Sequence, residues 1–302
     1  MKKAHKKVFK YFFDKSFIIA VNMMVAALYV SSFVLTPEKL SSKNAQKARF
    51  TSQNKPVSLT QISHLPEDHV TEGSFTRAPE FTDSVAIPRV FAAYLPAELG
   101  GITNIKNKQE IFVQTLLPHI LKHNEDILAD RTYLLRLRRI VDSGNSLSFE
   151  QRLWLEDLAK RYNIKRVSFE ELLKRVDIIP PSLALGQAVV ESGWGGCKFA
   201  RKQNSPFGLM KDKKRLLTFD SLSEGVKTYM DTLNKHPAYD SLRRIRAQQR
   251  LEGARPCSLK LADGLLYYST RRHAYTRQLK QIIDVHCFKK YDCARLATEL
   301  KS

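Results

Sequence analysis

One glutamate in this sequence stands where a carboxyl group could act as a proton donor. Glu191 follows the apolar run Leu183–Val190 and precedes the glycine-rich stretch Gly193–Gly196. This pattern predicts a short helix that ends at the glycines, because glycine readily adopts the positive φ angles that terminate helices. The helix dipole and the apolar run both raise the pKa of a carboxyl group at that end. Such a group could stay protonated near neutral pH, as a general acid must, although a surface glutamate is the common alternative.

The segment before this glutamate predicts the helices that position it. Over Asn107–Val141, apolar side chains recur at spacings of three, four and seven residues, which is typical of one helix face. Pro118 interrupts this face, so we expect the helix to kink or split there. Capping-box patterns at Ser148 and Ser168 predict two further helix starts. A proline pair that ends at Pro181 then suits the first turn of the helix that carries the glutamate.

The chain divides into a linker and a mostly helical unit. Residues 36–105 hold six of the twelve prolines and many serines and threonines, which predicts a linker with a short ordered stretch at Val90–Leu95. Residues 106–178 are expected to form a helical segment, and residues 179–302 the domain around the glutamate. No β-type alternation competes with the helical pattern there, so the expected fold class is mostly α.

The amino-terminal residues predict a membrane anchor. Met1–Ser16 contains six lysines and one acidic residue, and Phe17–Leu35 is nineteen residues long without a charge. At ~1.5 Å per residue, the second stretch nearly spans a ~30 Å hydrocarbon core, and the lysines should remain cytoplasmic. A cleaved signal peptide and a buried soluble helix are the alternatives. The anchor would hold the chain at the inner (cytoplasmic) membrane by a single pass, with residues 36–302 in the periplasm or another extracytoplasmic space.

The net charge predicts an anionic partner. The chain has 50 Lys+Arg against 30 Asp+Glu, a net charge of +20 and a pI near 9.8. Nucleic acid, an acidic membrane surface and an acidic cell-wall polymer would each attract such a chain. Export disfavours nucleic acid, and no zinc-finger, RRM or KH signature occurs. The basic run Arg243–Arg250 is expected to be a solvated face or to attract acidic groups.

The cysteines and histidines do not predict a metal site. Four cysteines in an oxidising compartment allow three pairings, and Cys257 could join either Cys287 or Cys293. The sequence does not choose between these two. No CxxC pair occurs and the eight histidines are scattered, so neither zinc nor another cofactor is expected.

The residues around the glutamate resemble a known enzyme family. The stretches Gln187–Gly195, Phe199–Arg201 and Asn204–Gly208 are similar to the glucosaminidase domain of glycoside hydrolase family 73. Within that family they resemble the Bax-type bacterial proteins, which carry this domain after a helical segment. Further matches, from Phe219–Ser221 to Tyr268-Ser269, extend the resemblance to roughly residues 88–290.

The resemblance implies a fold and a set of site residues. It implies a lysozyme-like α fold in which Glu191 matches the catalytic acid and Tyr275 an active-site tyrosine, although Tyr275 could instead pack on the core. Substrate-binding residues by the same comparison are Trp194, Asn204, Phe207 and Tyr268. Of these, Trp194 could instead close the core or wall the acid pocket, and Asn204 and Phe207 could shape the turn after the site.

The second carboxylate of a glycosidase is the gap in this assignment. Glycoside hydrolysis normally uses two carboxylates, and the resemblance places the second on a β-lobe after the Phe-Gly motif. Here that stretch, Leu209–Phe219, is short and holds one acid among basic residues, Asp212. Asp212 is the nominee, since Glu224 reads as the capping partner of Ser221 or Asp220. Assistance by the substrate's N-acetyl group, or water activation by the glutamate itself, would need no partner.

These observations together predict a peptidoglycan hydrolase of the cell envelope. The expected activity is that of an endo-β-N-acetylglucosaminidase, acting on glycan strands with Glu191 as general acid. A lytic transglycosylase and a non-catalytic peptidoglycan-binding or scaffold protein on the same fold are the alternatives. A basic nucleic-acid-binding protein is a distant third.

Overall fold

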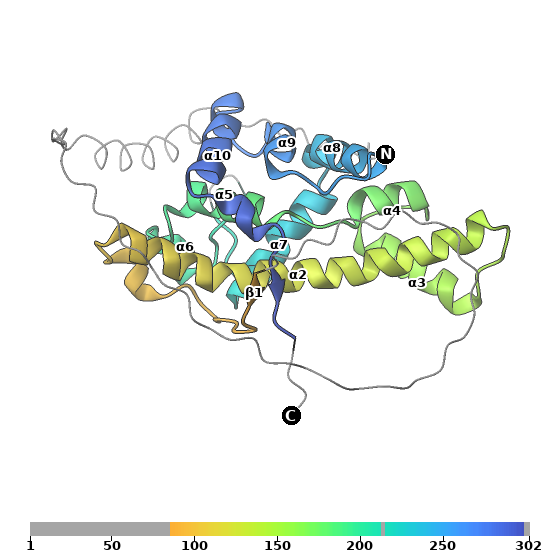
Figure 1. The fold of residues 1–302 in the computed structure, drawn as a ribbon, viewed down its shortest axis with the longest axis horizontal. Coiled ribbons are helices and arrows are strands. Elements are labelled where there is room, and N and C mark those ends of the chain that lie inside the picture. Colours follow the sequence, from red (N-terminus) through yellow and green to blue (C-terminus); the bar gives the residue numbers. More distant parts are fainter. Residues whose placement is uncertain (1–84, 213–214, 299–302) are drawn as a thin grey trace, which may run out of the picture. The chain divides into compact units, whose positions relative to one another are not determined.

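The computed structural model describes residues 85–212 and 215–298 (Figure 1). The predicted anchor Phe17–Leu35 and the first part of the predicted linker lie outside these residues. None of the helices in the described part of the chain is both long and apolar enough to cross a membrane.

The described residues are mostly helical, as predicted. The α-helices are α2 (Ile105–Asp142), α3 (Phe149–Arg161), α4 (Phe169–Arg175), α5 (Pro181–Ser192), α6 (Lys198–Lys202), α7 (Leu222–Lys235), α8 (Asp240–Leu251), α9 (Ser258–Ala262) and α10 (His273–Val285). Four short 3₁₀ turns join them in the described residues: η1 (Ala97–Gly100), η2 (Pro237–Tyr239), η3 (Asp263–Leu265) and η4 (Phe288–Tyr291). Strand β1 (Ala86–Ile87) pairs in parallel with β2 (Arg295–Leu296), in the register Ala86 with Arg295.

The long helix α2 is continuous through Pro118, so the predicted split at this residue is wrong. The side chain of Asn104 caps its first turn by accepting from the backbone N–H groups of Lys106 and Asn107. A proline inside a helix removes one hydrogen bond and costs about 3 kcal/mol. Leu117 and Ile120, on either side of Pro118, are buried in the core. Packing of this face outweighs the lost hydrogen bond.

The predicted helix starts are confirmed. Ser148 and Gln151 form a reciprocal capping box at the start of α3. The side chain of Ser168 accepts from the backbone of Glu171 at the start of α4. Helix α5 begins at Pro181, where the missing N–H of proline leaves no bond unmade.

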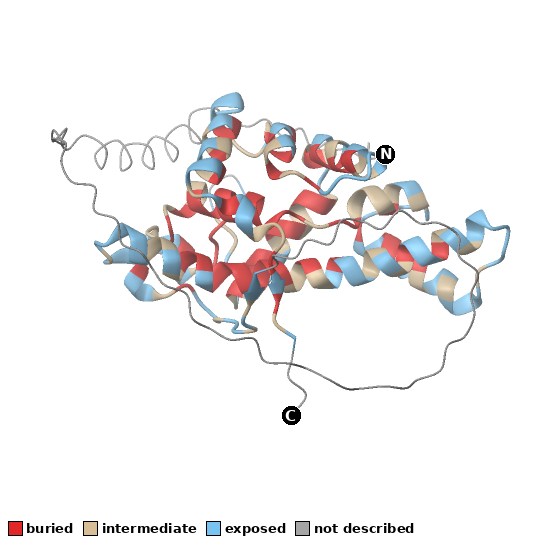
Figure 2. Cartoon of the chain, in the orientation of Figure 1, coloured by how far each residue is buried: buried red, intermediate tan, exposed pale blue. Residues whose placement is uncertain are grey.

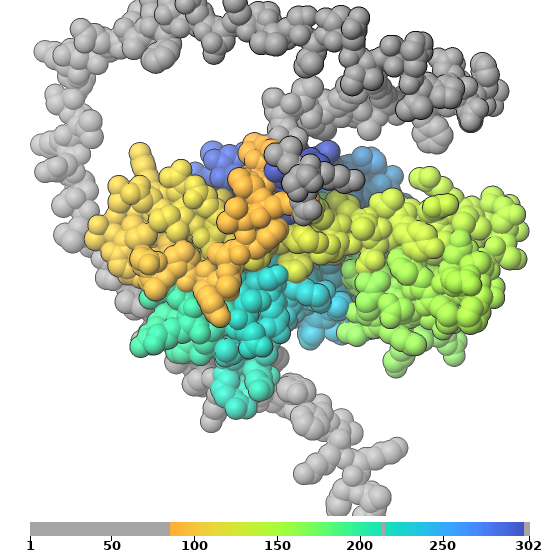
Figure 3. Space-filling view, turned by 90° about the horizontal axis from the view of Figure 1, so that it is seen from below, coloured from red at the N-terminus to blue at the C-terminus, as the bar shows by residue number. Residues whose placement is uncertain are grey.

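Residues 85–104, here called the strap, differ from the predicted linker. Leu95 and Leu99 of the strap are buried, and the backbone N–H of Leu222 donates to the carbonyl of Ala93 at 2.8 Å. His119 of α2 also contacts the strap, through the carbonyl of Ala92 at 2.9 Å. Figure 3 shows the strap, in orange, on the surface beside the green and cyan segments that follow α5. Ordered packing therefore begins before residue 105.

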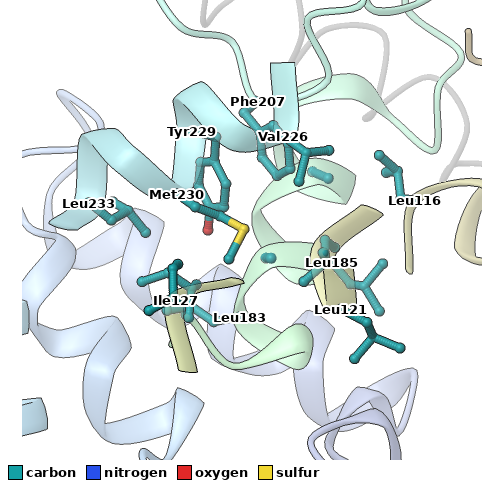
Figure 4. Packing of buried hydrophobic residues seen from close by; sticks show 14 of the residues in the cluster. Leu116, Leu121, Ile127, Leu183, Leu185, Phe207, Val226, Tyr229, Met230 and Leu233 are labelled. Carbon is teal, nitrogen blue, oxygen red and sulfur yellow. The ribbon is translucent and has the colours of Figure 1, made fainter. Parts of the chain in front are cut away.

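Helix α5 lies at the centre of the described unit. Its residues from Pro181 to Val189 are all buried, and it packs against α2, α9 and α10 (Figure 2). Leu183 lies beside Ile127 of α2 and Leu185 beside Leu121, and Tyr229 and Met230 of α7 lie nearby (Figure 4). One hydrophobic core therefore joins the helices before residue 178 to those after it.

The basic run Arg243–Arg250 is not the solvated face that was expected. Arg243 and Arg246 are only 1% and 0% exposed. Arg246 donates to the backbone carbonyl of Asp177 at 3.1 Å, and Arg250 forms a two-bond pair with the Asp177 carboxylate at 2.8 and 2.9 Å. Buried guanidinium groups need such partners. These arginines tie α8 to the segment that leads into α5.

Candidate active site

Glu191 lies in the last turn of α5, as predicted. The helix ends at Gly193, which has φ 57° and ψ 52°, and Trp194 and Gly195 also have positive φ. The hydroxyl of Ser192 donates to a carbonyl of the preceding turn and accepts the backbone N–H of Gly195 at 3.0 Å. The glycine turn therefore stops α5 one residue after the glutamate and fixes where its side chain starts.

The Glu191 carboxyl group has a strongly raised pKa. Glu191 is partly buried, and burial raises the pKa of its carboxyl group from 4.5 to about 7. A hydrogen bond from Tyr275 and the positive charge of Arg271 act in the opposite direction, because both favour the charged form. Near neutral pH, a substantial fraction of Glu191 therefore carries a proton.

A chain of hydrogen bonds determines how Tyr275 meets this carboxyl group. The Tyr229 hydroxyl donates to the Gln187 side-chain carbonyl at 2.8 Å, and the Gln187 amide donates to the Tyr275 hydroxyl oxygen at 3.0 Å. All three side chains are buried. Since Tyr275 already accepts from Gln187, its own proton is available for Glu191, to which it is hydrogen-bonded. The Gln187 amide thus sets the direction of the hydrogen bond at the acid.

Four tyrosines lie close to the glutamate. They are Tyr229, Tyr239, Tyr268 and Tyr275. The Tyr268 and Tyr275 rings stack at 5.6 Å and 16°, and the Tyr268 hydroxyl donates to the carbonyl of Phe207 at 2.8 Å. Burial raises the pKa of each of the four hydroxyl groups, and the charge of Glu191 raises it further; that of Tyr239 reaches about 12. The phenols are therefore neutral donors at any physiological pH.

Gly208 brings the backbone close to the carboxyl group. Its φ is 63°, and a Cβ atom placed there would lie 3.1 Å from Oε2 of Glu191. Both facts favour glycine at this position, because a side chain would be strained and would crowd the acid. The loop between α6 and α7 therefore forms one wall of the site through its main chain.

The structure favours core packing over substrate binding for Trp194. The indole is 5% exposed and packs edge-on against the rings of Phe112 at 5.7 Å and His286 at 4.7 Å. A ring enclosed in this way cannot stack on a sugar. The positive φ of Trp194 turns its side chain toward α2 and the core, which accounts for the difference.

Two more predicted substrate contacts lie behind the site. Asn204 is 2% exposed and its side-chain amide donates to the carbonyl of Phe219 at 3.1 Å. Phe207 is 1% exposed and stacks on Tyr229 at 3.8 Å. Both shape the loop rather than face a ligand, which was the alternative reading of them. Tyr268, by contrast, is partly exposed beside Tyr275.

Asp212 lies on a small hairpin-like excursion after Gly208. Met210 and Leu216 form an antiparallel bridge, and the Asp212 carboxylate pairs with Arg215 at 2.6 Å. Asp212 is not among the groups that shift the pKa of Glu191. The predicted capping role of Glu224 is confirmed, since its side chain accepts the backbone N–H of Asp220 at 3.1 Å while its own backbone N–H donates to the Ser221 hydroxyl.

Sequence reasoning missed several residues that the fold brings to the glutamate. Gln187 lies one helical turn before Glu191, and that spacing of four residues was the available signal. Tyr229, Tyr239 and Arg271 are 38 or more residues away in sequence, and only the tertiary fold brings them to the glutamate.

The structure contains no disulfide between the cysteines. All four are free thiols, so Cys257 is joined to neither Cys287 nor Cys293. In the described residues, no group of three or more His, Cys, Asp or Glu side chains is placed to hold a metal ion.

Two comparisons with known proteins found a match. The family model described as "Mannosyl-glycoprotein endo-beta-N-acetylglucosaminidase" matches residues 167–287, which include Glu191 and Tyr275. The chain is 34% identical over 188 residues to "Protein bax" of Escherichia coli (strain K12), covering 57% of this chain and 67% of that protein. No solved structure matches the chain.

Proposed function

From the premise that the chain belongs to the Bax family of glucosaminidase-domain proteins, we propose that it cleaves peptidoglycan glycan strands. The proposed reaction is that of an endo-β-N-acetylglucosaminidase, with Glu191 as the general acid. The observation that carries the proposal is a carboxyl group with a pKa of about 7, hydrogen-bonded to a buried tyrosine. Family membership also supports a lysozyme-like fold, with residues 179–302 as the catalytic domain and residues 209–219 as a reduced β-lobe.

The surroundings of Glu191 suit proton donation to a glycosidic oxygen. Protonated Glu191 gives its proton to the leaving oxygen as the glycosidic bond breaks. The carboxylate that remains then accepts the Tyr275 hydroxyl, and this bond stabilises the charged form. Gln187 and Tyr229 hold Tyr275 in the donating orientation throughout.

The water-activating step follows one of two kinds of route: the first needs no second acid, and the second uses one. Assistance by the N-acetyl group, or activation of water by the Glu191 carboxylate after proton transfer, requires no second acid. Asp212 is the candidate if a second acid is used, because the excursion that carries it follows Gly208 directly in sequence. Replacement of Asp212 by asparagine separates these routes: a small effect favours the first, and a loss close to that of Glu191→Gln favours Asp212.

A transglycosylase and a binding protein remain the competing functions, because no second carboxylate is assigned. Mass analysis of purified peptidoglycan after incubation with the protein separates all three. New reducing N-acetylglucosamine ends are expected. A 1,6-anhydromuramyl end would mean a transglycosylase, and the absence of any product would mean a binding protein.

We also propose that the chain is held at the cytoplasmic membrane by Phe17–Leu35, with the glucosaminidase domain outside. The support is the lysine-rich segment Met1–Ser16 that precedes this apolar stretch. A reporter that is active only in the cytoplasm, fused after Ser302, should be silent. Strong reporter activity would refute the proposed location.

A further inference from the structure

Two adjacent arginines form no ion pair among the described residues, and the charge of the first, Arg271, acts on the Glu191 carboxyl group. Arg271 and Arg272 are exposed and immediately precede α10. Among the described residues, neither forms an ion pair: the Arg271 side chain donates to Gln278, and that of Arg272 to the carbonyl of Leu266 at 3.4 Å. The nearby acid Asp263 is paired with a lysine of α10. Arg271 and Arg272 therefore carry positive charge that no ion pair among the described residues neutralises.

An aromatic ring contacts each of the two guanidinium groups. Arg271 lies over the ring of Tyr275 at 5.9 Å, and its charge is felt at Glu191. Arg272 lies over the ring of Tyr267 at 4.4 Å, and Tyr267 is 64% exposed. Contact with a ring face fixes a guanidinium without using up its donors. Each arginine therefore keeps N–H groups for a ligand that occupies the site.

The backbone of Arg272 is strained in a way that points to function. Arg272 has φ 49° and ψ −118°, and Ala274 donates to the carbonyl of Arg271 at 3.0 Å. This is the geometry of a type II′ turn whose first central position glycine normally occupies. Any residue with a side chain is disfavoured there. A strained arginine at the edge of a candidate active site indicates that its side chain serves a purpose other than stability.

We propose that Arg271 and Arg272, with Tyr267, form a subsite for a carboxylate on the muramyl side of the glycan. This proposal rests on the proposed function, since it assumes that glycan reaches Glu191. Each muramic acid residue carries a lactyl carboxyl group, which is either free or linked to a peptide that bears its own carboxylates. Paired guanidinium donors suit a carboxylate, and an exposed tyrosine ring can cover an adjacent sugar. The subsite would make the protein select muramic-acid-containing glycan over neutral chitin-like glycan.

The test compares three forms of one glycan. They are peptide-free strands with free lactyl carboxylates, the same strands capped as neutral methylamides, and strands with intact peptides. Binding by calorimetry and KM for cleavage are measured for the parent and for Arg272→Gly. The parent should favour the free carboxylate over the methylamide by about tenfold, as expected for one charge-assisted contact. Arg272→Gly should lower this ratio markedly toward one.

Glycine at position 272 also separates function from folding. Because glycine suits the observed φ and ψ, Arg272→Gly should melt at the same temperature as the parent or higher. Arg277, an exposed arginine of α10, is the matched control, and Arg277→Gln should keep the parent's ratio. If Arg272→Gly loses only the preference for peptide-bearing strands, the peptide carboxylates are the ligand of the subsite, and the proposal holds. The proposal would be overturned if the parent prefers neither the free-carboxylate strands nor the peptide-bearing strands to the methylamide form, or if Arg272→Gly keeps both preferences. Selective binding without cleavage would keep the subsite and refute the hydrolase.

Discussion

At the scale of single residues, burial and a hydrogen bond act in opposite directions on the Glu191 carboxyl group. Burial prevails and raises its pKa to about 7, so Glu191 is protonated below that pH and loses its proton above it. A general acid acts only when protonated. We therefore expect cleavage of peptidoglycan to decline as the pH rises through about 7. Initial rates of reducing-end release across that range measure this, and a rate that keeps rising above pH 8 would contradict it.

The same pKa has a consequence for stability. The folded pKa is raised above the ordinary 4.5, so the folded protein keeps a proton that the unfolded chain releases. Stability from this group is therefore fully present below about pH 4.5 and is lost as the pH rises through about 7. Glu191→Gln removes this loss and should be more stable than the parent at pH 8, by roughly 1–3 kcal/mol. Urea unfolding at pH 8 and near pH 4.5 tests this, and the difference should vanish at the lower pH.

Tyr229→Phe tests the chain of hydrogen bonds behind the acid. Without the Tyr229 donor, the Gln187 carbonyl is free to accept the Tyr275 proton, and Glu191 loses its hydrogen bond. That bond favours the charged carboxylate, so the pKa of Glu191 should rise and the alkaline limb of the pH–rate profile should move to higher pH. We also expect kcat to fall about tenfold, which is the size of one lost hydrogen bond.

Tyr162 provides the matched control. It is a buried tyrosine at the end of α3, outside the group of tyrosines around Glu191. Tyr162→Phe should leave the pH–rate profile unchanged. A profile that is equally unchanged in Tyr229→Phe would mean that Gln187 does not orient Tyr275.

The role of a residue followed from sequence only where local pattern determines it. Glu191 was predictable because the apolar run and the glycines that flank it are adjacent in sequence. Trp194 was not, because its direction depends on a positive φ that sequence does not reveal for tryptophan. Tyr229 and Arg271 reach the acid through tertiary packing alone.

At the scale of elements, the loop from α6 to α7 passes close to the Glu191 carboxyl group at Gly208, a position that has no side chain. In Gly208→Ala, the new Cβ atom would lie 3.1 Å from Oε2 of Glu191. The alanine would also have to adopt a positive φ, which residues with a side chain disfavour. We expect a loss of about 1 kcal/mol of stability from the backbone alone and at least a tenfold fall in activity. Thermal melting and reducing-end release measure the two effects.

Gly253 provides a control that separates the effect on stability from the effect on activity. Its φ is 70°, and a Cβ atom there would meet nothing within 4 Å. Gly253→Ala should therefore lose a similar amount of stability and keep full activity. Equal activity in both variants would show that the close approach of Gly208 to Glu191 has no catalytic consequence.

Element boundaries were predictable where capping chemistry marks them, as at Ser148, Ser168 and Pro181. Pro118 misled because the cost of an interior proline is local, whereas the burial of the surrounding helix face is not visible in sequence. The arginines of α8 misled for the opposite reason. A buried guanidinium needs carbonyl partners that come from another helix, and only the fold supplies them.

At the scale of the whole molecule, the strap supports the turn after Glu191. The side chain of Leu99 is fully buried and lies against Gly195, so close that a Cβ atom there would be 2.8 Å from it. Leu99→Ala should lower the free energy of unfolding by about 2–5 kcal/mol. Val90, also in the strap, is 71% exposed, and Val90→Ala should change it by less than about 0.5 kcal/mol. Similar small changes in both variants would mean that the strap does not belong to the folded unit.

The strap was assigned to the linker because it was grouped with the proline-, serine- and threonine-rich residues before it. Its own residues are mostly apolar, and two buried leucines with a few backbone hydrogen bonds attach it to the rest. The mostly helical character of the chain was predictable, since apolar periodicity persists over whole helices. The convergence of α5, α7 and α10 on one carboxyl group required the fold.

The central claim is that Glu191 donates a proton to the glycosidic oxygen of peptidoglycan. The most direct measurement is the rate of release of reducing N-acetylglucosamine ends from purified peptidoglycan by the parent and by Glu191→Gln, with folding of both checked by circular dichroism. The substitution keeps the shape of the side chain and removes the proton, so the rate should fall by about 10²–10⁴ while glycan binding persists. A folded Glu191→Gln protein that releases these ends at close to the parent rate would contradict the claim.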